Sequence, residues 1–298
     1  MRKTTTLLVA VLTAGIAAVA PAGVDGRGKA VMQKRTGYGL TNGGSLVKFE
    51  AANTSRVRRV GTITGLAAGE RLVGIDIRPV VGEIYGLGDK SNVYEINRRT
   101  GRATRKSSLT AAGGGAVTLR GSSFGIDFNP TSDRLRVTSD SGQNLRINVD
   151  SGVTATDGDL ANRNGGGQPR VVGVAYSNND GDSFLDRSQL VPAGRRATGT
   201  RLYAIDAARS SLAVQDPPND GTLQTVGRLR RGTGSDVGFD IFSPVNGEGN
   251  TVGNVGYASL RRGGVTRLYK VNLRTGRTTA VRGGRGAFRT VKDIAIVP

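Results

Sequence analysis

Four aspartates that recur along the chain have the residue type and spacing that best suggest chemistry. Each lies inside a short apolar stretch, and they are Asp76, Asp127, Asp240 and Asp293. Alternation along a strand places each carboxylate on the opposite face from its apolar neighbours. If such strands surround an axis, the carboxylates concentrate negative potential and can hold a cation such as calcium, or a cationic ligand. The alternative is structural: a buried carboxylate accepts hydrogen bonds from backbone amides of its own or the next repeat.

A second group of oxygen ligands follows the degenerate stretch 173–176, which lacks the acid. Residues 178–182 read NNDGD and resemble the first half of a calcium loop. The segment lacks glycine at the sixth loop position and a clear bidentate glutamate at the twelfth. Asn178, Asp180 and Asp182 are therefore metal candidates, and the alternative is a loop whose polar side chains cap their own backbone. Calcium is the one cofactor that the sequence suggests; otherwise we expect none.

A polar hairpin between two apolar runs supplies further candidates for contact with a ligand. Turn chemistry alone explains Asp140 and the following Gly142, so a purely structural reading stays open. The ligand-binding candidates are Asp76, Asp127, Asn129, Asp140, Gln143, Asn144, Arg146 and Asp240.

The composition excludes several classes of enzyme. The chain has no Cys and no His, so Ser-His-Asp and Cys-His nucleophilic systems, His-based metal sites and structural zinc sites are ruled out. Any catalysis must come from Asp, Glu, Lys, Tyr or Ser, or from a hard cation. The net charge of +19 attracts polyanions without discriminating among them.

The N-terminus has the three parts of a secretory signal. Arg2 and Lys3 form a basic start, residues 7–20 are apolar, and residues 20–22 form a small-x-small cleavage site. A retained anchor is the alternative, although the run is shorter than the roughly 20 residues that span a bilayer. We predict a signal peptide over 1–22, a disordered linker over 23–35 and one domain over 36–298, in a protein that is secreted or associated with the cell envelope and has no membrane span in its mature chain.

The rest of the chain reads as copies of one unit of about 50 residues. Glycine is abundant, with 46 residues, and short runs rich in Val, Ile, Leu and Thr alternate with turns. Each unit contains an Asp-centred stretch, two alternating strands, an Asn-x-x-Thr/Ser-Gly turn and a fourth strand. The Asp-type starts are at 74, 125, 173, 238 and 293.

The two ends of the chain complement each other. The first unit has strands over 38–40, 46–49 and 57–63 but no Asp-centred start, and the last start, at 293–297, has no strands after it. Pairing them closes a ring and removes an exposed sheet edge. We therefore predict an all-β propeller of about five four-stranded blades, closed by the C-terminal strand on the N-terminal blade. Six blades stay open because 184–200 could hold another hairpin.

One long segment carries a resemblance to a known family. Residues 125–152, GIDFNPTSDRLRVTSDSGQNLRINVDSG, resemble the hallmark of a bacterial secreted family catalogued as domain of unknown function number four-three-nine-four. Residues 174–180, VAYSNND, and 215–223, QDPPNDGTL, are similar to two further stretches of it. The resemblance covers roughly 38–298 and implies an exported propeller-like domain without an assigned activity. The arginine content and an insertion over 184–196 depart from the family pattern.

Three functional hypotheses follow. The first is a non-catalytic binding or scaffold module for a wall polymer, a polysaccharide or a protein, because the usual catalytic residue types are missing and a propeller presents loops on two faces. The second is a hydrolase or lyase whose axial cation is held by Asp76, Asp127, Asp240 and a neighbouring Asn. The third is polyanion binding by charge alone. We expect a monomer with no specific nucleic-acid partner.

Overall fold

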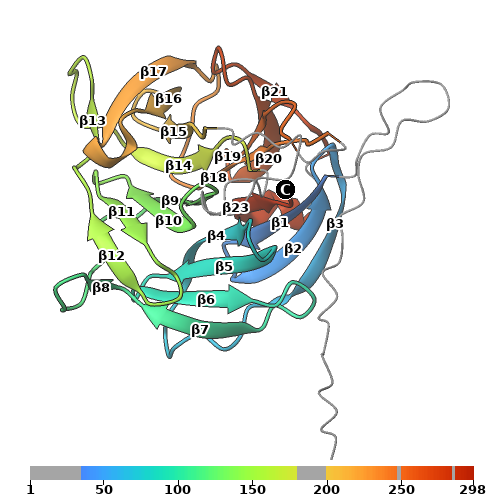
Figure 1. The fold of residues 1–298 in the computed structure, drawn as a ribbon. Coiled ribbons are helices and arrows are strands. Elements are labelled where there is room, and N and C mark those ends of the chain that lie inside the picture. The colour runs from blue at the N-terminus through green and yellow to red at the C-terminus, as the bar shows by residue number, and fades with distance from the viewer. Residues whose placement is uncertain (1–34, 180–198, 247–249, 284–285) are drawn as a thin grey trace, which may run out of the picture.

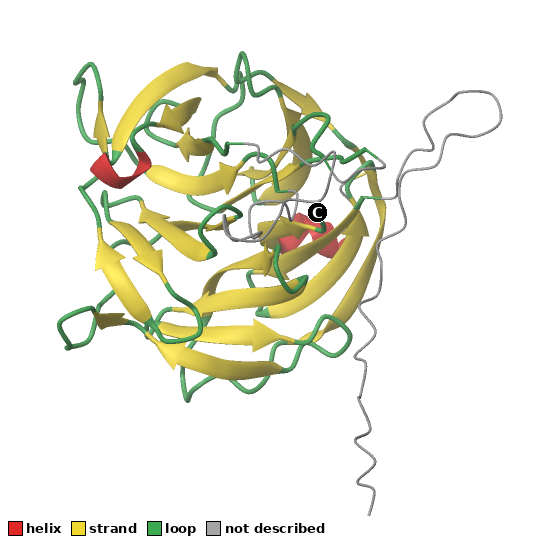
Figure 2. Ribbon diagram, in the orientation of Figure 1, coloured by secondary structure: helices red, strands yellow, loops and turns green. Residues whose placement is uncertain are grey.

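Five mainly antiparallel sheets arranged in a ring form this all-β domain, as the computed structural model shows (Figure 1). The structure describes residues 35–179, 199–246, 250–283 and 286–298. Strands dominate that part of the chain, and its helices are the short 3-10 turns η2 (Pro218–Asp220) and η3 (Gly286–Thr290) (Figure 2). The predicted five-bladed propeller is confirmed.

Each blade has four strands, counted outward from the axis. The innermost strands are β23 (Val291–Ile296), β4 (Leu72–Arg78), β9 (Phe124–Asn129), β14 (Val171–Tyr176) and β18 (Val237–Phe242), in blades 1 to 5. The second strands are β1 (Thr36–Thr41), β5 (Glu83–Gly88), β10 (Arg134–Ser139), β15 (Leu202–Asp206) and β19 (Val255–Arg262). The third are β2 (Ser45–Glu50), β6 (Asn92–Ile96), β11 (Asn144–Ile147), β16 (Ser211–Gln215) and β20 (Val265–Val271). The outermost are β3 (Asn53–Thr62), β7 (Ala103–Ser108), β12 (Val153–Thr156), β17 (Thr222–Arg228) and β21 (Thr278–Ala280).

The ring closes in blade 1, where the two ends of the chain meet. Strand β23 pairs antiparallel with β1, from Gly37 opposite Ile296 to Leu40 opposite Asp293. Each inner strand also contacts the inner strand of the next blade, from β4 round to β23 and back to β4. The predicted closure by the C-terminal strand is confirmed.

The sequence grouped Asp293 with the other three repeated aspartates, and this grouping is wrong. Asp293 lies two residues before the position in β23 that corresponds to them. Asp76 lies opposite Tyr85 in blade 2, whereas Ala295 lies opposite Tyr38 in blade 1. Ala295 is therefore the true counterpart of Asp76, and Asp293 precedes that position. A shift of two residues leaves a side chain on the same face of a strand, so alternation alone could not reveal it, although the repeat starts at 74 and 293 already align Ala295 with Asp76.

The repeated Asn-x-x-Thr/Ser-Gly turn joins the third and fourth strands and caps itself. In blade 3 the side chain of Asn148 accepts hydrogen bonds from the amides of Asp150 and Ser151, at 3.1 and 3.4 Å. Gly152 closes the turn with φ of +78°, and a Cβ there would lie 2.0 Å from the carbonyl oxygen of Ser108 in blade 2. The glycine permits both the left-handed turn and the close approach of the preceding blade.

Neighbouring blades are also joined at their outer edges. After leaving a blade, the chain pairs in parallel with the outermost strand of the next one. The short strands that do so are β8 (Thr110–Ala111) on β12, β13 (Ala161–Asn162) on β17 and β22 (Arg282–Gly283) on β3. Five apolar clusters lie in the blades and at their junctions, so the core is distributed around the ring.

Several predictions fall on parts of the chain outside the described residues. They are the signal peptide over 1–22, the linker over 23–34, Asp180 and Asp182, and the insertion over 184–196 with its possible extra hairpin. Arg35, the last residue of the predicted linker, donates from its backbone amide to Glu50 and from its guanidinium to Tyr257. No helix in the described ranges is long and apolar enough to cross a membrane.

Candidate functional site

Three carboxylates meet near the axis of the ring. Asp76, Asp127 and Asp240 lie at equivalent positions on β4, β9 and β18, and one oxygen of each falls within 4.8 Å of the others. All three residues are buried, with 2 to 6% of their surface exposed. The corresponding positions of blades 4 and 1 hold Ala175 and Ala295. Three of the four repeated aspartates are thus brought together as the sequence predicts.

Each axial carboxylate also links its own blade to the next. Asp76 accepts a hydrogen bond from the amide of Phe128 at 2.7 Å, and Asp127 accepts one from Tyr176 at 2.8 Å. Asp240 binds the amide of Ile296 in the same way. These bonds are the structural role predicted from the sequence as the alternative to cation binding. The proximity of the three carboxylates is also compatible with a bound cation.

Asp293 provides the link that Ala295 cannot. Its carboxylate accepts a hydrogen bond from the amide of Ile75 in blade 2, at 2.7 Å. A Cβ on Gly74 would lie 2.8 Å from the same carboxylate oxygen, so the glycine leaves the space that this contact needs. An acid displaced by two residues thus joins blade 1 to blade 2.

The electrostatics of the axis favour protonated acids. Burial raises the pKa of Asp240 to about 7 and that of Asp293 to about 8. Burial also raises the pKa values of Asp76 and Asp127 well above the ordinary value, and the neighbouring carboxylates add to the effect. Such a group can relieve its repulsion by sharing protons or by binding a cation.

The two hairpin candidates Asp140 and Gln143 are engaged by the protein itself. Asp140 accepts hydrogen bonds from the amides of Ser122 and Ser123 and from the Ser122 hydroxyl. These bonds lower its pKa against the effect of its partial burial. Gln143 is 4% exposed; it accepts from the amide of Arg120 and donates to the carbonyl of Thr118. Both side chains fix the loop that precedes β9.

Asn144 and Arg146 belong to a polar network between blades 3 and 4. Its centre is Arg136, which is 1% exposed and donates to Asn144 at 2.8 Å and to Asp157 at 2.6 Å. Arg146 binds the same Asp157 carboxylate through two nitrogens, at 2.7 and 2.9 Å. Arg136 also reaches Asn219 in blade 4. This network ties residues 125–152 to residues 215–223, two of the segments that resemble the family.

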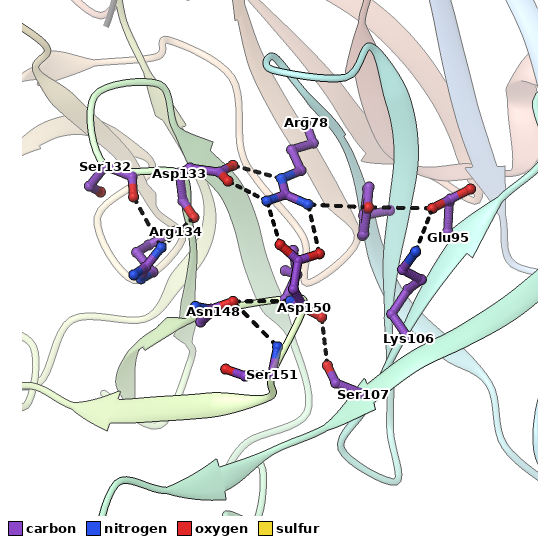
Figure 3. Close-up of polar contacts among 12 residues, drawn as sticks. Arg78, Glu95, Lys106, Ser107, Ser132, Asp133, Arg134, Asn148, Asp150 and Ser151 are labelled. Carbon is purple, nitrogen blue, oxygen red and sulfur yellow. Dashed lines mark hydrogen bonds and ion pairs between the residues drawn. The ribbon is translucent and has the colours of Figure 1, made fainter. Parts of the chain in front are cut away.

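A second buried arginine joins blades 2 and 3, and sequence reasoning missed it. Arg78, at the end of β4, lies between the carboxylates of Asp133 and Asp150 (Figure 3). Its guanidinium also contacts the hydroxyl and ring face of Tyr85. The two carboxylates raise the pKa of Arg78, and Arg78 in turn lowers the pKa of Asp150. The sequence did carry one signal of this buried position. Arg78 follows Asp76 by two residues, so the two side chains lie on the same face of β4.

Asn129 and Asn178 are engaged by the protein itself, Asn129 within its own turn and Asn178 with a residue 76 positions away. The side chain of Asn129 accepts from the amide of Thr131 at 2.8 Å, which caps the turn after β9. Asn178 has φ of +59° and exchanges side-chain and backbone hydrogen bonds with Asn254. Its expected partners Asp180 and Asp182 lie outside the described residues.

Two open clefts in the surface are lined by cations. The first, of about 450 Å³, lies between blades 1 and 2, and its charged lining residues are Lys48, Arg58, Arg59, Arg98 and Arg99. Arg98 lies 3.9 Å from Glu83, and Arg59 donates to two hydroxyl groups. Lys48, Arg58 and Arg99 are exposed, and none of them has an ion-pair partner within 4.0 Å among the described residues.

The second cleft, of about 710 Å³, lies on blade 4. Its charged lining residues are Arg209, Arg228, Arg230 and Arg231. Arg209 is partly engaged, because it forms an ion pair with Asp206 at 2.8 Å. The sequence predicted a basic surface on turns but not that the arginines of separate turns would line shared clefts.

Some solved structures are similar to this chain at low sequence identity. A symmetrical protein from work on its de novo evolutionary emergence under folding constraints has a TM-score of 0.47 and 14% identity, over 87% of this chain and 97% of its own. A structural genomics protein of unknown function from Bacteroides thetaiotaomicron has a TM-score of 0.45 and 17% identity, over 92% and 68%. A protein from Lactobacillus plantarum has a TM-score of 0.40 and 14% identity, over 88% and 71%.

No curated protein is similar enough in sequence to count as a match. The sequence pattern of one family spans residues 45–295, which include four inner strands and all but the last residue of β23, together with both buried arginines and every Asp of the axis. The resemblance noted on residues 125–152 thus extends over almost the whole ring. The chain belongs to the family described as Domain of unknown function (DUF4394).

Proposed function

We propose that this protein is an exported, non-catalytic binding module that engages an anionic polymer of the cell envelope. The observation that carries the proposal is the cleft between blades 1 and 2, where five cationic side chains converge. Planar guanidinium groups bind carboxylates and phosphates through paired hydrogen bonds, and a cleft holds several of them in one place. A flexible polymer with regularly spaced anions matches such a surface.

The proposal is tested by binding to alginate, a polysaccharide with one carboxylate per sugar, with neutral dextran as the reference polymer. The double variant Arg58→Ser/Arg99→Ser removes two cations from the cleft. Arg105→Ser/Arg277→Ser removes the same charge at exposed positions outside both clefts. We expect the cleft variant to bind alginate about tenfold more weakly than wild type, and the control to change little, because distant exposed charges are screened beyond about 10 Å.

Two results would contradict the proposal. Equal losses in the two double variants would favour binding by net charge alone, the third hypothesis from the sequence. Undetectable alginate binding at low salt would remove the polymer as a ligand. Biolayer interferometry on immobilised polymer, repeated at rising salt, separates these cases.

Export and oligomeric state belong to the same proposal. The support for export is the three-part N-terminal pattern over residues 1–22. Cell fractionation with N-terminal sequencing should find a mature chain that starts near Gly23 and has a net charge of +17, because Arg2 and Lys3 are removed. A membrane-bound chain that keeps Arg2 would instead support the anchor. Light scattering should give the mass of a monomer.

A second candidate role, binding of calcium at the axis, is favoured by the convergence of Asp76, Asp127 and Asp240. Calcium takes oxygen ligands at about 2.3–2.6 Å, so two ligands of one ion lie up to about 5 Å apart. The observed limit of 4.8 Å between the three oxygens fits that geometry. Because these residues are at most 6% exposed, a cation there would stabilise the ring more readily than it would meet a substrate, which weakens the hydrolase hypothesis.

Thermal melting at pH 8 tests the calcium site. Calcium should raise the melting temperature of the wild-type protein and leave that of Asp127→Asn unchanged. An equal response of the two proteins would place the ion elsewhere, and no response would remove the site.

A further inference from the structure

A third cavity lies at the opposite end of the junction between blades 1 and 2 from the basic cleft. Thr36 and Tyr38 at the start of β1 border the basic cleft, whereas Leu40 and Thr41 at its end border this cavity. Its volume is about 340 Å³. That volume is at the lower end of the range of small-molecule pockets, about 300–1,000 Å³. The cavity therefore suits a small molecule better than a polymer.

The floor of the cavity is hydrocarbon. Leu40, Ile63 and Leu72 are buried there, with 1 to 8% of their surface exposed, and Leu66 packs against the same cluster. These residues come from β1, from the chain after β3 and from β4. Apolar surface of this kind favours an aliphatic group over water.

Two cations border the same cavity, Lys292 from β23 and Arg71 from the segment before β4. The ammonium of Lys292 donates to the carbonyl oxygen of Leu72 at 2.7 Å, and no carboxylate lies within 4.0 Å of it among the residues that the structure describes. Burial lowers the pKa of Lys292, and Arg71 lowers it further; Asp293, Asp236 and Asp89 act in the opposite direction from a distance.

The acid that borders the cavity is already engaged. The carboxylate of Glu70 accepts hydrogen bonds from the amide of Lys90 and the side chains of Asn92 and Tyr94. Glu70 therefore neutralises neither Lys292 nor Arg71 by direct pairing. The cavity combines an apolar floor with cations that lack a close anion.

We propose that this cavity binds a small monocarboxylate with a hydrocarbon chain, whose carboxylate pairs with Lys292 and Arg71 and whose chain lies on the leucines. The ligand supplies the anion that the protein does not, and the hydrocarbon displaces water from the floor. The proposal does not depend on polymer binding, because the residues involved are separate from those of the basic cleft.

The first test uses the wild-type protein and octanoate as the probe. Acetylation of lysines by a water-soluble reagent is followed by mass spectrometry with and without octanoate. We expect octanoate, at about ten times the dissociation constant found by calorimetry, to slow the modification of Lys292 by about tenfold, because only the unoccupied protein reacts, and to leave Lys90 unaffected. Octan-1-ol, which has the chain without the charge, should protect Lys292 far less.

The second test measures octanoate binding by calorimetry. Lys292→Met keeps the length of the side chain and removes its charge, and Arg71→Gln removes the exposed cation without touching the core. Each should weaken binding by about tenfold, whereas Lys90→Met, a neighbouring lysine outside the cavity, should not. Arg71→Gln keeps the test decisive if Lys292→Met folds poorly.

The proposal is overturned if octanoate fails to protect Lys292 at any soluble concentration. It is also overturned if octan-1-ol protects as well as octanoate, because the cavity would then be only an apolar site. Loss of octanoate binding in the Arg58→Ser/Arg99→Ser variant would show that the acid binds the basic cleft instead, and would likewise overturn the proposal.

Discussion

At the scale of single residues, the buried polar groups of this ring combine blade-to-blade hydrogen bonds with unusual charge placement. Asp76, Asp127 and Asp240 each bind an amide of the next blade, yet their mutual proximity makes full ionisation unfavourable. The buried arginines Arg78 and Arg136 are in contrast paired with carboxylates on the neighbouring elements. We therefore expect removal of the charge at an axial aspartate to make stability less dependent on pH, and removal of the charge at a buried arginine to lower stability.

The first prediction concerns pH. The pKa of Asp240 in the folded protein is raised from 3.8 to about 7, so the folded state binds more protons than the unfolded state in this interval. Its contribution to stability is therefore fully present below pH 3.8 and is lost as the pH rises through 7. Asp240→Asn, which keeps an acceptor for the amide of Ile296, should reduce the fall in melting temperature between pH 5 and pH 8. The same fall in both proteins would contradict the shifted pKa.

The second prediction concerns Arg78. Arg78→Met leaves the largely buried carboxylate of Asp133 without its partner, which should lower the free energy of unfolding by about 3–5 kcal/mol. Asp150→Asn is the matched change at the exposed partner, whose side chain is 57% accessible. It should cost less than about 1 kcal/mol. Urea denaturation measures both, and equal costs would show that the burial of Asp133 does not govern the energetics.

At the scale of elements, the blades are set by short turns and by the approach of one blade to the next. The Asn-x-x-Thr/Ser-Gly turn defines where the third strand ends and the fourth begins in blades 2, 3 and 5. In each, the glycine also lies against the chain leaving the preceding blade. The space between blades therefore requires a glycine at this position as much as the backbone angle does.

The third prediction separates these two effects. Gly165→Ala places a side chain at φ of +69° in open space and should cost about 1 kcal/mol for the backbone alone. Gly152→Ala adds a contact of 2.0 Å with the carbonyl of Ser108 and should cost a further 1–3 kcal/mol, roughly, for overpacking. Chemical denaturation of the two variants checks the difference. Equal costs would mean that blades 2 and 3 can separate without penalty.

At the scale of the whole molecule, stability depends on closing the ring. Strand β23 supplies the inner strand of blade 1 and contacts both β18 and β4. Its residues Ile294 and Ile296 belong to the apolar cluster between blades 5 and 1. Without it, two apolar surfaces and the inner edge of β1 would be exposed to water.

The fourth prediction is that deleting residues 293–298 prevents stable folding. Circular dichroism should show no cooperative thermal transition above room temperature for the truncated chain, and a synthetic peptide of residues 289–298 should restore part of the β signal. A truncated protein that melts at the wild-type temperature would refute the role of closure.

The sequence alone predicted the repeat and the closure of the ring, because these follow from alternation, turn residues and complementary ends; it indicated about five blades, and the five sheets of the structure decided between five and six. The missing His and Cys likewise exclude whole classes of chemistry from composition alone. These features are local or compositional, so they can be read without knowing which segments meet in space.

The tertiary structure decided which residues share a site. Alternation could not distinguish Asp293 from Ala295, since both lie on one face of β23, and pairing with β1 established that Ala295 takes the axial position. Arg78 and Asp133, 55 residues apart, were likewise brought together by the packing of blades. The basic clefts also depend on the packing of the blades, because each is lined by arginines from separate segments of the chain. Nothing in the sequence separates these arginines from the others on the surface.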